Sequence, residues 1–469
     1  MSKDKKSASK ELKKTLFYEK KNSYILMEDD EIKKTNIFCE GYKKFLNIAK
    51  TEREANIYAI KAAEAKGFKE YKPGMGLCAG DKIYVNNRGK AVILAIIGTA
   101  PLEEGARICA AHIDSPRLDL KQCPLYEDSE MALFKTHYYG GIKKYQWTAI
   151  PLALHGVVVL EDGTQINVVI GEDENDPVFV VSDLLPHLAS EQMKKPATQV
   201  IAGEDLNIIV GSRPFKDDEG SELVKLNIMS ILNEKYGIKE EDFLSAELEA
   251  VPAFKASDLG FDRSMIGAYG HDDRVCAYPA LEAILNTKKV VKTAVTVLTD
   301  KEETGSDGNT GLQSSYLKYF FEDIANEFGL RGSTVLSHSE CLSADVNAAF
   351  DPTFPGGFEK KNSAYINYGV CVTKFTGARG KSGTSDASAE FVGRVRSLLN
   401  KNGVIWQTGE LGKVDAGGGG TVAAYIANLN VDTIDVGVPV LSMHAPYETV
   451  AKTDVYNAYR AFKVFIEDK

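Results

Sequence analysis

The chain has 469 residues, of which 44% are hydrophobic and 26% charged, a composition typical of soluble globular proteins with two or three structural units. A net charge of −10 argues against a nucleic-acid partner, and no apolar run approaches the length of a membrane span. The seven cysteines are scattered without a CxxC pair, so we expect neither a disulfide framework nor a thiolate zinc site and predict a reduced, cytoplasmic protein.

The first predicted elements follow a lysine-rich start that also contains Asp4 and Glu11 and has no apolar core. We expect a solvated terminus here rather than a signal peptide. Residues 36–66 carry apolar side chains at helical spacing, and residues 91–98 and 107–111 are predicted strands.

His112 and Asp114 form the first candidate site, directly after the second of these strands. Residues two apart on a strand project to the same face, so Asp114 can hold the imidazole of a metal-binding histidine. A polar pair on the protein surface is the alternative reading at this point of the chain.

The character of the chain changes at about residue 118. Four short runs of strand-like pattern and one amphipathic segment follow, at 155–160, 165–171, 178–181, 206–211 and 221–236. We therefore predict a mostly β domain of residues 118–254, inserted into an α/β domain that consists of residues 1–117 and 255–469.

Two acidic stretches mark the return of the α/β pattern. Asp272 and Asp273 precede a predicted helix at 275–286, where capping of the helix N-terminus is a sufficient explanation for them. A predicted buried strand at 290–298 ends in Asp300-Lys-Glu302-Glu303. Open α/β sheets bind ligands at the carboxyl ends of their strands, and adjacent glutamates repel each other unless a cation or a proton is near. A solvated acidic turn is the alternative.

The rest of the chain alternates between helices and strands, with further polar residues between them. In order, the sequence predicts a helix at 312–328, a strand at 333–336 before Asp345, a strand at 365–375, a helix at 387–399, a strand at 404–407, a glycine loop at 417–420, a helix to 428, a strand at 433–440 before His444, and a helix from 454.

Five acidic or imidazole positions thus occupy strand ends or loop–helix junctions of one α/β unit: His112, Asp273, Glu303, Asp345 and His444. Two imidazoles and three carboxylates form a nitrogen and oxygen ligand set suited to zinc, cobalt or manganese. Their number suits two metal ions that share one carboxylate and leave positions open for water. Glu302, next to a candidate ligand, is then the candidate general base.

Several stretches occur together in a specific order: AAHIDSPRLDLK, GHDDRVCAY, DKEETGSDG, SADVNAAFDP, GGGGT and LSMHAPYET. In this order they resemble the M18 metallo-aminopeptidases of the MH clan, the family of aspartyl aminopeptidase and aminopeptidase I. The resemblance implies a mixed-sheet α/β/α metallopeptidase domain with an inserted, mostly β dimerisation domain. It also implies hydrolysis of the N-terminal residue from peptides.

The resemblance further implies two divalent metal ions per subunit, zinc with cobalt or manganese as alternatives. Its ligands match His112, Asp273 and Asp345 for one ion, and Asp273, Glu303 and His444 for the other. Asp273 matches the shared aspartate because the family's aspartate directly precedes an asparagine or arginine. Glu302 matches the general base, and Asp114 matches the aspartate that orients His112.

Substrate binding and assembly are also implied by the resemblance. His187 matches a histidine that the inserted domain offers to a neighbouring subunit, and the family assembles as a tetrahedral dodecamer of dimers. The family's pocket for acidic residues pairs a lysine with a following Arg-Tyr; Lys374 matches the lysine, but no tyrosine follows here. Gly420 and Thr421 belong to a loop that resembles the lining of the substrate pocket, with a flexible connection as the alternative.

Two other functions are compatible with parts of the sequence. Residues 380–382 read Gly-Lys-Ser between a strand and a helix, as in a nucleotide-binding P-loop, but Phe375 stands where a P-loop needs a glycine. A non-catalytic member of the same fold is the second alternative. The complete set of candidate ligands and Glu302 argues against it.

Overall fold

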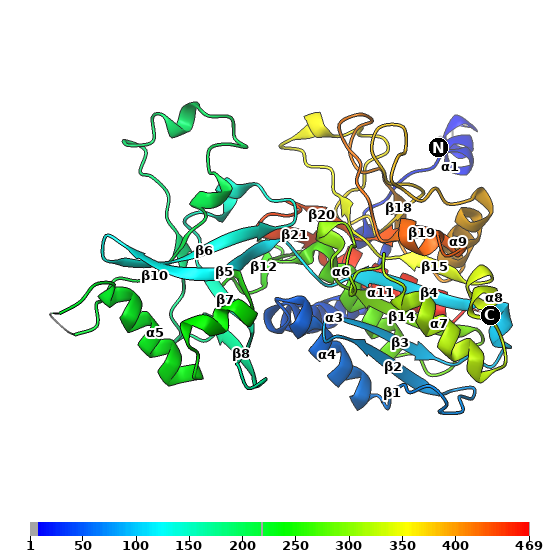
Figure 1. Cartoon of the computed structure of the whole chain (residues 1–469). Coiled ribbons are helices and arrows are strands. Elements are labelled where there is room, and N and C mark those ends of the chain that lie inside the picture. Colours follow the sequence, from blue (N-terminus) through cyan, green and yellow to red (C-terminus); the bar gives the residue numbers. More distant parts are fainter. Residues whose placement is uncertain (1–7, 217–218, 469) are drawn as a thin grey trace.

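The computed structural model describes residues 8–216 and 219–468. Figure 1 shows two bodies side by side, a helix-covered sheet on the right and a mostly β unit on the left. Lys3, Lys5 and Lys6 lie outside the described residues, and the rest of that lysine-rich stretch forms an exposed helix, α1 (Ala8–Leu16), where we expected a frayed end. Within the described ranges, no helix has the length and apolar character needed to cross a bilayer.

A nine-stranded mixed sheet forms the middle of the larger body, in the order β1-β2-β3-β14-β4-β15-β19-β17-β18. The four central strands β14, β4, β15 and β19 run parallel to one another, and β3 and β17 flank them in antiparallel pairing. The strands are β1 (Lys69–Glu70), β2 (Lys82–Asn87), β3 (Ala91–Ile96), β4 (Ala106–His112), β14 (Thr293–Thr299), β15 (Glu340–Ser343), β17 (Val370–Thr373), β18 (Trp406–Thr408) and β19 (Asp432–Gly437).

Helices cover both faces of this sheet, because its central strands are apolar on both sides. In β3, Val92 and Leu94 belong to one buried cluster and Ile93 and Ala95 to the other, as the two-residue period of a strand requires. The first cluster includes side chains of α3 (Asp29–Ile48), α4 (Glu52–Ala65), α6 (His271–Leu285), α9 (Ala389–Lys401) and α11 (Lys452–Ile466). The second includes α7 (Tyr316–Glu327), α8 (Gly332–Ser337) and α10 (Ala423–Ala427). The predicted three-layer α/β/α arrangement is confirmed.

Two predicted elements differ from the structure. The helix expected at 36–66 is broken into α3 and α4, because Thr51 and Glu54 form a capping box that starts a new helix. The strand expected at 333–336 is wrong: these residues lie in α8, and the strand β15 begins at Glu340. A short apolar run fits a helix or a strand equally well, and Val335 and Leu336 pack into the second cluster from a helix.

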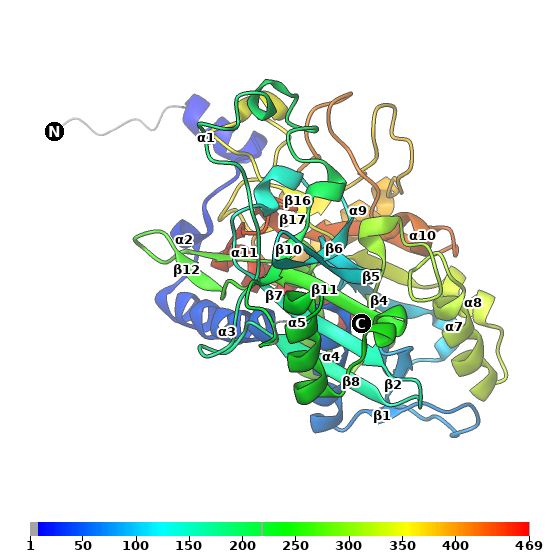
Figure 2. The ribbon, with the colours of Figure 1, turned by 60° about the vertical axis from the view of Figure 1, so that its left-hand side comes forward.

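The second body is an antiparallel sheet of seven strands, in the order β8-β7-β11-β5-β6-β10-β9, with its own buried cluster around Trp147. Helix α5 (Leu223–Tyr236) packs against β5, β6 and β10 (Figure 2). The strands are β5 (Arg117–Asp128), β6 (Met131–Tyr139), β7 (Leu152–Val159), β8 (Gln165–Ile170), β9 (Val180–Val181), β10 (Ile208–Gly211) and β11 (Ala246–Pro252). We call this body the inserted unit.

The inserted unit leaves and rejoins the larger body beside the ends of the central strands. The chain enters it at Arg117, five residues after β4 ends at His112, and returns after Pro252. It then enters a small five-stranded sheet, in the order β12-β13-β21-β20-β16. These strands are β12 (Ser257–Leu259), β13 (Met265–Ala268), β16 (Asn347–Ala348), β20 (Pro439–Leu441) and β21 (Glu448–Ala451).

Candidate metal centre

The parallel pairing of the central strands brings the separate polar stretches together. His112 at the end of β4 pairs with Thr299 at the end of β14, so the glutamates that follow β14 lie beside His112. Strand β15 pairs with the other side of β4, and Asp345 follows β15 by two residues. His444 comes from the turn between β20 and β21.

Asp272 lies between the two histidines. Its Oδ1 is 3.1 Å from Nε2 of His112, and its Oδ2 is 3.1 Å from Nε2 of His444. Asp273, which the sequence suggested as the shared aspartate, accepts a hydrogen bond from the backbone N–H of His112 at 3.3 Å and lies with His112 and Asp345 in a group that could hold a metal ion. The difference arises because α6 is kinked at its start, with ψ of 110° at Asp272 and 24° at Asp273.

Asp114 sets the orientation of the His112 ring. Nδ1 of His112 lies 3.1 Å from the backbone oxygen of Asp114 and 3.2 Å from its Oδ1, so this nitrogen donates a hydrogen bond. Nε2 is therefore the ring nitrogen that faces the site and would bind a metal ion. The Asp114 carboxylate also accepts the backbone N–H groups of Glu302 and Glu303, each at 3.2 Å. One buried carboxylate thus connects the end of β4 to the acidic turn after β14.

Glu302 and Glu303 begin the short helix η6 (Glu302–Thr304) and face different histidines. Oε2 of Glu302 is 3.8 Å from Nε2 of His112, and Oε2 of Glu303 is 3.6 Å from Nε2 of His444. Burial raises the pKa of Glu302 to about 7, although the charge of His112 opposes this shift. Burial and then the negative charge of Asp272 raise the pKa of Glu303 well above its usual range. Asp345, whose Oδ1 is 4.0 Å from Nε2 of His112, is also buried, and burial raises its pKa.

The charges and donor atoms of this cluster fit a divalent cation. Burial opposes a charge on His112 and His444, yet the surrounding carboxylates outweigh it and raise the pKa of His444 to about 10 and that of His112 well above its usual value. The site thus attracts positive charge. Oε1 of Glu303 is buried and has no hydrogen-bond partner among the described residues. Two groups of side chains have ligand atoms within 4.8 Å of one another: His112, Asp273 and Asp345 form one, and Asp272, Glu303 and His444 form the other. Their nitrogen and oxygen atoms are ligands that suit zinc.

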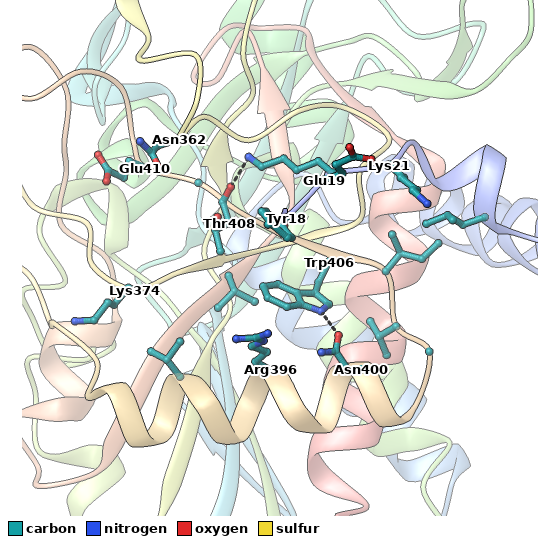
Figure 3. Close-up of a pocket in the computed structure, with 18 of the residues that line it drawn as sticks. Tyr18, Glu19, Lys21, Asn362, Lys374, Arg396, Asn400, Trp406, Thr408 and Glu410 are labelled. Atoms are coloured by element: carbon teal, nitrogen blue, oxygen red, sulfur yellow. Dashed lines mark hydrogen bonds between the residues drawn. The ribbon is translucent and has the colours of Figure 1, made fainter. Parts of the chain in front are cut away.

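The predicted substrate-binding residues lie in exposed loops or beside them. Lys374 is at one end of a groove of about 990 Å³ between residues 18–21 and α9, with Trp406 in its middle (Figure 3). Its ammonium group pairs with Asp386, as does that of Lys381. Among the described residues that line this groove, none belongs to the cluster above. His187 is exposed in the long segment between β9 and β10.

Gly420 and Thr421 follow a glycine loop that packs on residues 376–378. The backbone N–H of Gly377 donates to the carbonyl of Gly419 at 2.8 Å, and a side chain at Gly418 would collide with the Gly377 carbonyl. Gly420 is exposed and Thr421 is buried just before α10. The loop is therefore held in place against its neighbour rather than extended freely into solvent.

The nucleotide-binding alternative does not fit the structure. Helix α9 begins at Ala389, seven residues after Ser382, so residues 380–382 do not open a helix as a P-loop must. The Lys381 ammonium group lies over the ring of Phe375, 3.8 Å from its centroid, and pairs with Asp386.

Sequence reasoning missed three residues that support the cluster. Tyr139 donates its phenol proton to Oδ2 of Asp114 at 2.7 Å, and the Gly141 carbonyl lies 2.7 Å from Nδ1 of His444. The buried Glu448 accepts the backbone N–H groups of His444 at 2.7 Å and Asp272 at 3.1 Å. The only signals in the sequence were the Tyr-Gly-Gly run at 139–141 and a glutamate four residues after His444.

Comparisons with known proteins agree with this geometry. A family model described as "Aminopeptidase I zinc metalloprotease (M18)" matches residues 45–466. The probable M18 family aminopeptidase 1 of Clostridium acetobutylicum is 52% identical over 461 residues, which cover 97% of this chain and 99% of that protein. The crystal structure of aminopeptidase I from the same organism has a TM-score of 0.91 at 51% identity and covers 97% of this chain and 100% of that chain.

A more distant structure, the mApe1 dodecamer of S. cerevesiae, shares the fold with a TM-score of 0.75 at 20% identity, covering 93% of this chain and 97% of that one. The predicted family, fold class and enzyme class are confirmed by the full-length matches. The chain belongs to the M18 family of zinc metalloproteases and is a metallo-aminopeptidase.

Proposed function

We propose that the chain removes single residues from the N-terminus of peptides with two zinc ions held at this cluster. His112, Asp272 and Asp345 would hold one ion, and Asp272, Glu303 and His444 the other. The observation that carries the proposal is the position of the Asp272 carboxylate, whose two oxygens are each 3.1 Å from a different histidine. Asp273 supports the backbone of His112 in this proposal and is not the shared ligand.

The chemistry follows from the residues around the two ions. Two divalent ions held by these residues would supply Lewis acidity for the hydrolysis. Glu302 would accept the proton of the attacking water and return it to the leaving amine, because its carboxylate lies beside His112 and is not one of the proposed ligands.

Assembly into a homo-oligomer is part of the same proposal, with the inserted unit as the dimer contact. Leu184, Leu185 and Leu188 around His187 are 53%, 50% and 68% exposed, which is costly unless another surface covers them. Strands β8 and β9 are the edges of the seven-stranded sheet, and open edges are usually covered. The dodecameric state of the yeast relative supports a dodecamer of dimers, with His187 reaching a neighbour's site. A cytoplasmic location stays a prediction.

The test compares matched peptides with free and acetylated N-termini. The zinc-loaded protein should hydrolyse only the free peptides, lose activity in a chelator and regain it with zinc, cobalt or manganese. No hydrolysis of any peptide by the metal-loaded oligomer would favour the non-catalytic alternative.

A preference for acidic first residues stays a prediction, and a panel of peptides that differ only in the first residue decides it. Lys374 and Lys381 share the single carboxylate of Asp386, which leaves one positive charge in this group. If Lys374 supplies the pocket's charge, peptides that begin with Asp or Glu are hydrolysed fastest. The variant Lys374→Ala then hydrolyses all peptides of the panel at similar rates. If peptides with neutral or basic first residues are hydrolysed fastest, the absence of the tyrosine of the family's pocket indicates that the acidic preference is absent too.

A further inference from the structure

The last strand residues of β6 bring the inserted unit into direct contact with the metal centre. The Tyr139 phenol donates to Oδ2 of Asp114 at 2.7 Å, and the next two residues are glycines. A Cβ atom at Gly140 would lie 3.0 Å from Oε2 of Glu303, and the Gly141 carbonyl is 2.7 Å from Nδ1 of His444. Three consecutive residues therefore contact both halves of the site.

Asp114 is the group through which Tyr139 can act on the site. Its carboxylate faces Nδ1 of His112 at 3.2 Å and accepts the backbone N–H groups of Glu302 and Glu303 at 3.2 Å each. The phenol contact, at 2.7 Å, is shorter than these three and comes from the inserted unit. The Tyr139 phenol therefore helps to fix the position of Asp114. Through Asp114 it acts on the His112 ring and on the turn that carries Glu302.

The ring of Tyr139 is itself held firmly. It is buried, with the guanidinium carbon of Arg117 4.0 Å from its centroid and the Lys301 ammonium group 5.6 Å from it. Arg117 is buried too and pairs with Glu52 of α4 and Glu249 of β11. The phenol oxygen is thus fixed by contacts from both bodies of the molecule, as a preorganised donor requires.

We propose that Tyr139 is a positioning residue of the metal centre, which aligns Asp114 and through it His112 and Glu302. The inserted unit then has a second role besides assembly: its docking completes the site within one chain. The inference rests on the proposed two-metal function, but part of its test needs no substrate.

The variant Tyr139→Phe keeps the ring on Arg117 and removes only the hydrogen bond to Asp114. Loss of such a partner behind a metal ligand typically lowers metal affinity or activity roughly 10- to 100-fold. We expect kcat to fall by about this factor with KM changed less than about twofold, because the phenol is buried against Asp114 and Arg117. In chelator competition without substrate, we expect the zinc ion at His112 to be lost at roughly tenfold lower chelator concentration.

Tyr138→Phe is the matched control. It removes the same oxygen from the preceding residue, which points to the other face of the strand, is 38% exposed and stacks on His137. Turnover and zinc retention of this variant should equal those of the unmodified protein. An equal loss in both variants would overturn the proposal.

Two further measurements separate positioning from general stability. Tyr139→Phe should unfold at a lower urea concentration than the unmodified protein in both the metal-free and the zinc-loaded forms, because the hydrogen bond to Asp114 does not need zinc. The difference should be larger in the zinc-loaded forms, since only these also lose zinc affinity. In an Asp114→Asn background, Tyr139→Phe should change zinc retention less than about twofold, because coupled residues are not additive. Additive losses, a zinc-loaded difference no larger than the metal-free one, or unchanged kcat and zinc retention would each reject the role of Tyr139. A parent protein without bound zinc or hydrolysis would instead reject the proposed function.

Discussion

Glu302 and Glu303 are neighbours in the chain and yet face different histidines across the metal centre. The left-handed backbone at Lys301, with φ of 72°, starts the short helix that separates the two side chains. One glutamate is therefore free for proton transfer while the other serves as a ligand in our proposal. This division of roles can be tested one residue at a time.

Replacing Glu302 by Gln should leave both zinc ions bound and lower kcat by roughly 10²- to 10⁴-fold, because an amide cannot accept the proton of the attacking water. Elemental analysis and peptide hydrolysis measure the two properties on one sample. The matched variant Glu303→Gln should instead lower the zinc content. Near-normal hydrolysis by Glu302→Gln would reject the assignment of the general base.

The aspartate pair gives a second prediction at this scale. Asp272→Ala should reduce bound zinc from two ions to one or none per chain, because both histidines lose their shared carboxylate. Asp273→Ala should keep more zinc, since it removes only a contact to the His112 backbone. Zinc content after gel filtration distinguishes them. If Asp273→Ala binds less zinc than Asp272→Ala, Asp273 is the shared ligand instead.

These two aspartates also show what the sequence could not decide. The order of strands and acidic turns was enough to bring His112, Glu302, Glu303, Asp345 and His444 together, because parallel strands end at one edge. The choice between Asp272 and Asp273 depends on the non-helical start of α6, and side-chain periodicity carries no information about such a kink.

At the scale of elements, the inserted unit is joined to α4 and its neighbours by buried ion pairs. His155 of β7 lies between Glu54 and Glu172, at 2.8 Å and 3.1 Å. Glu172 also meets the ammonium group of Lys50 at 2.6 Å. The pKa of Glu172 is lowered to about 2, because hydrogen bonds from His155 and the charge of Lys50 outweigh the opposing effect of burial.

Acid should therefore weaken this junction. The folded pKa of Glu172, about 2, lies below its usual 4.5, so its contribution is complete above about pH 4.5 and is lost as the pH falls toward 2. The shift corresponds to about 3 kcal/mol, which solvent screening reduces to about 1 to 2 kcal/mol. We expect Glu172→Gln to unfold at lower urea concentration at pH 7, with a smaller difference at pH 3.5.

The control for this experiment is Glu174→Gln, which changes the same charge at an exposed position two residues away. It should unfold like the unmodified protein at both pH values. A difference for Glu172→Gln that is the same at pH 7 and pH 3.5 would show that the ion pairs are not its cause.

Three strands of the inserted unit, β5, β6 and β11, were not predicted from the sequence, and two of them were missed for a local reason. β5 and β6 form a long hairpin whose turn residues, Ser129 and Glu130, have φ of 51° and 59°. Such turns are recognised by Gly, Asn or Asp, and neither residue is one of these. By contrast, the turn between β7 and β8 contains Asp162 and Gly163, which are residues of the usual kind, and both strands of this hairpin were predicted.

At the scale of the whole molecule, the exposed leucines and His187 predict that activity depends on assembly. His187→Ala should lower kcat without changing the zinc content, because the histidine would act on the neighbour's site. A variant made monomeric by charged residues at Leu184 and Leu188 should be nearly inactive while retaining zinc. Sedimentation and peptide hydrolysis of the same samples test both statements, and a fully active monomer would contradict them.

The order of strands in the central sheet also determines when the enzyme can first act during its synthesis. β14 lies between β3 and β4, so the sheet cannot close until the ribosome has released residues to Thr299, whereas the inserted unit is complete at Pro252. Because domains fold as units during translation, the inserted unit can fold while the larger body is still unfinished. His444 follows β19, the last strand of the central sheet in chain order. The peptidase thus stays inert until every strand of that sheet and His444 have been synthesised.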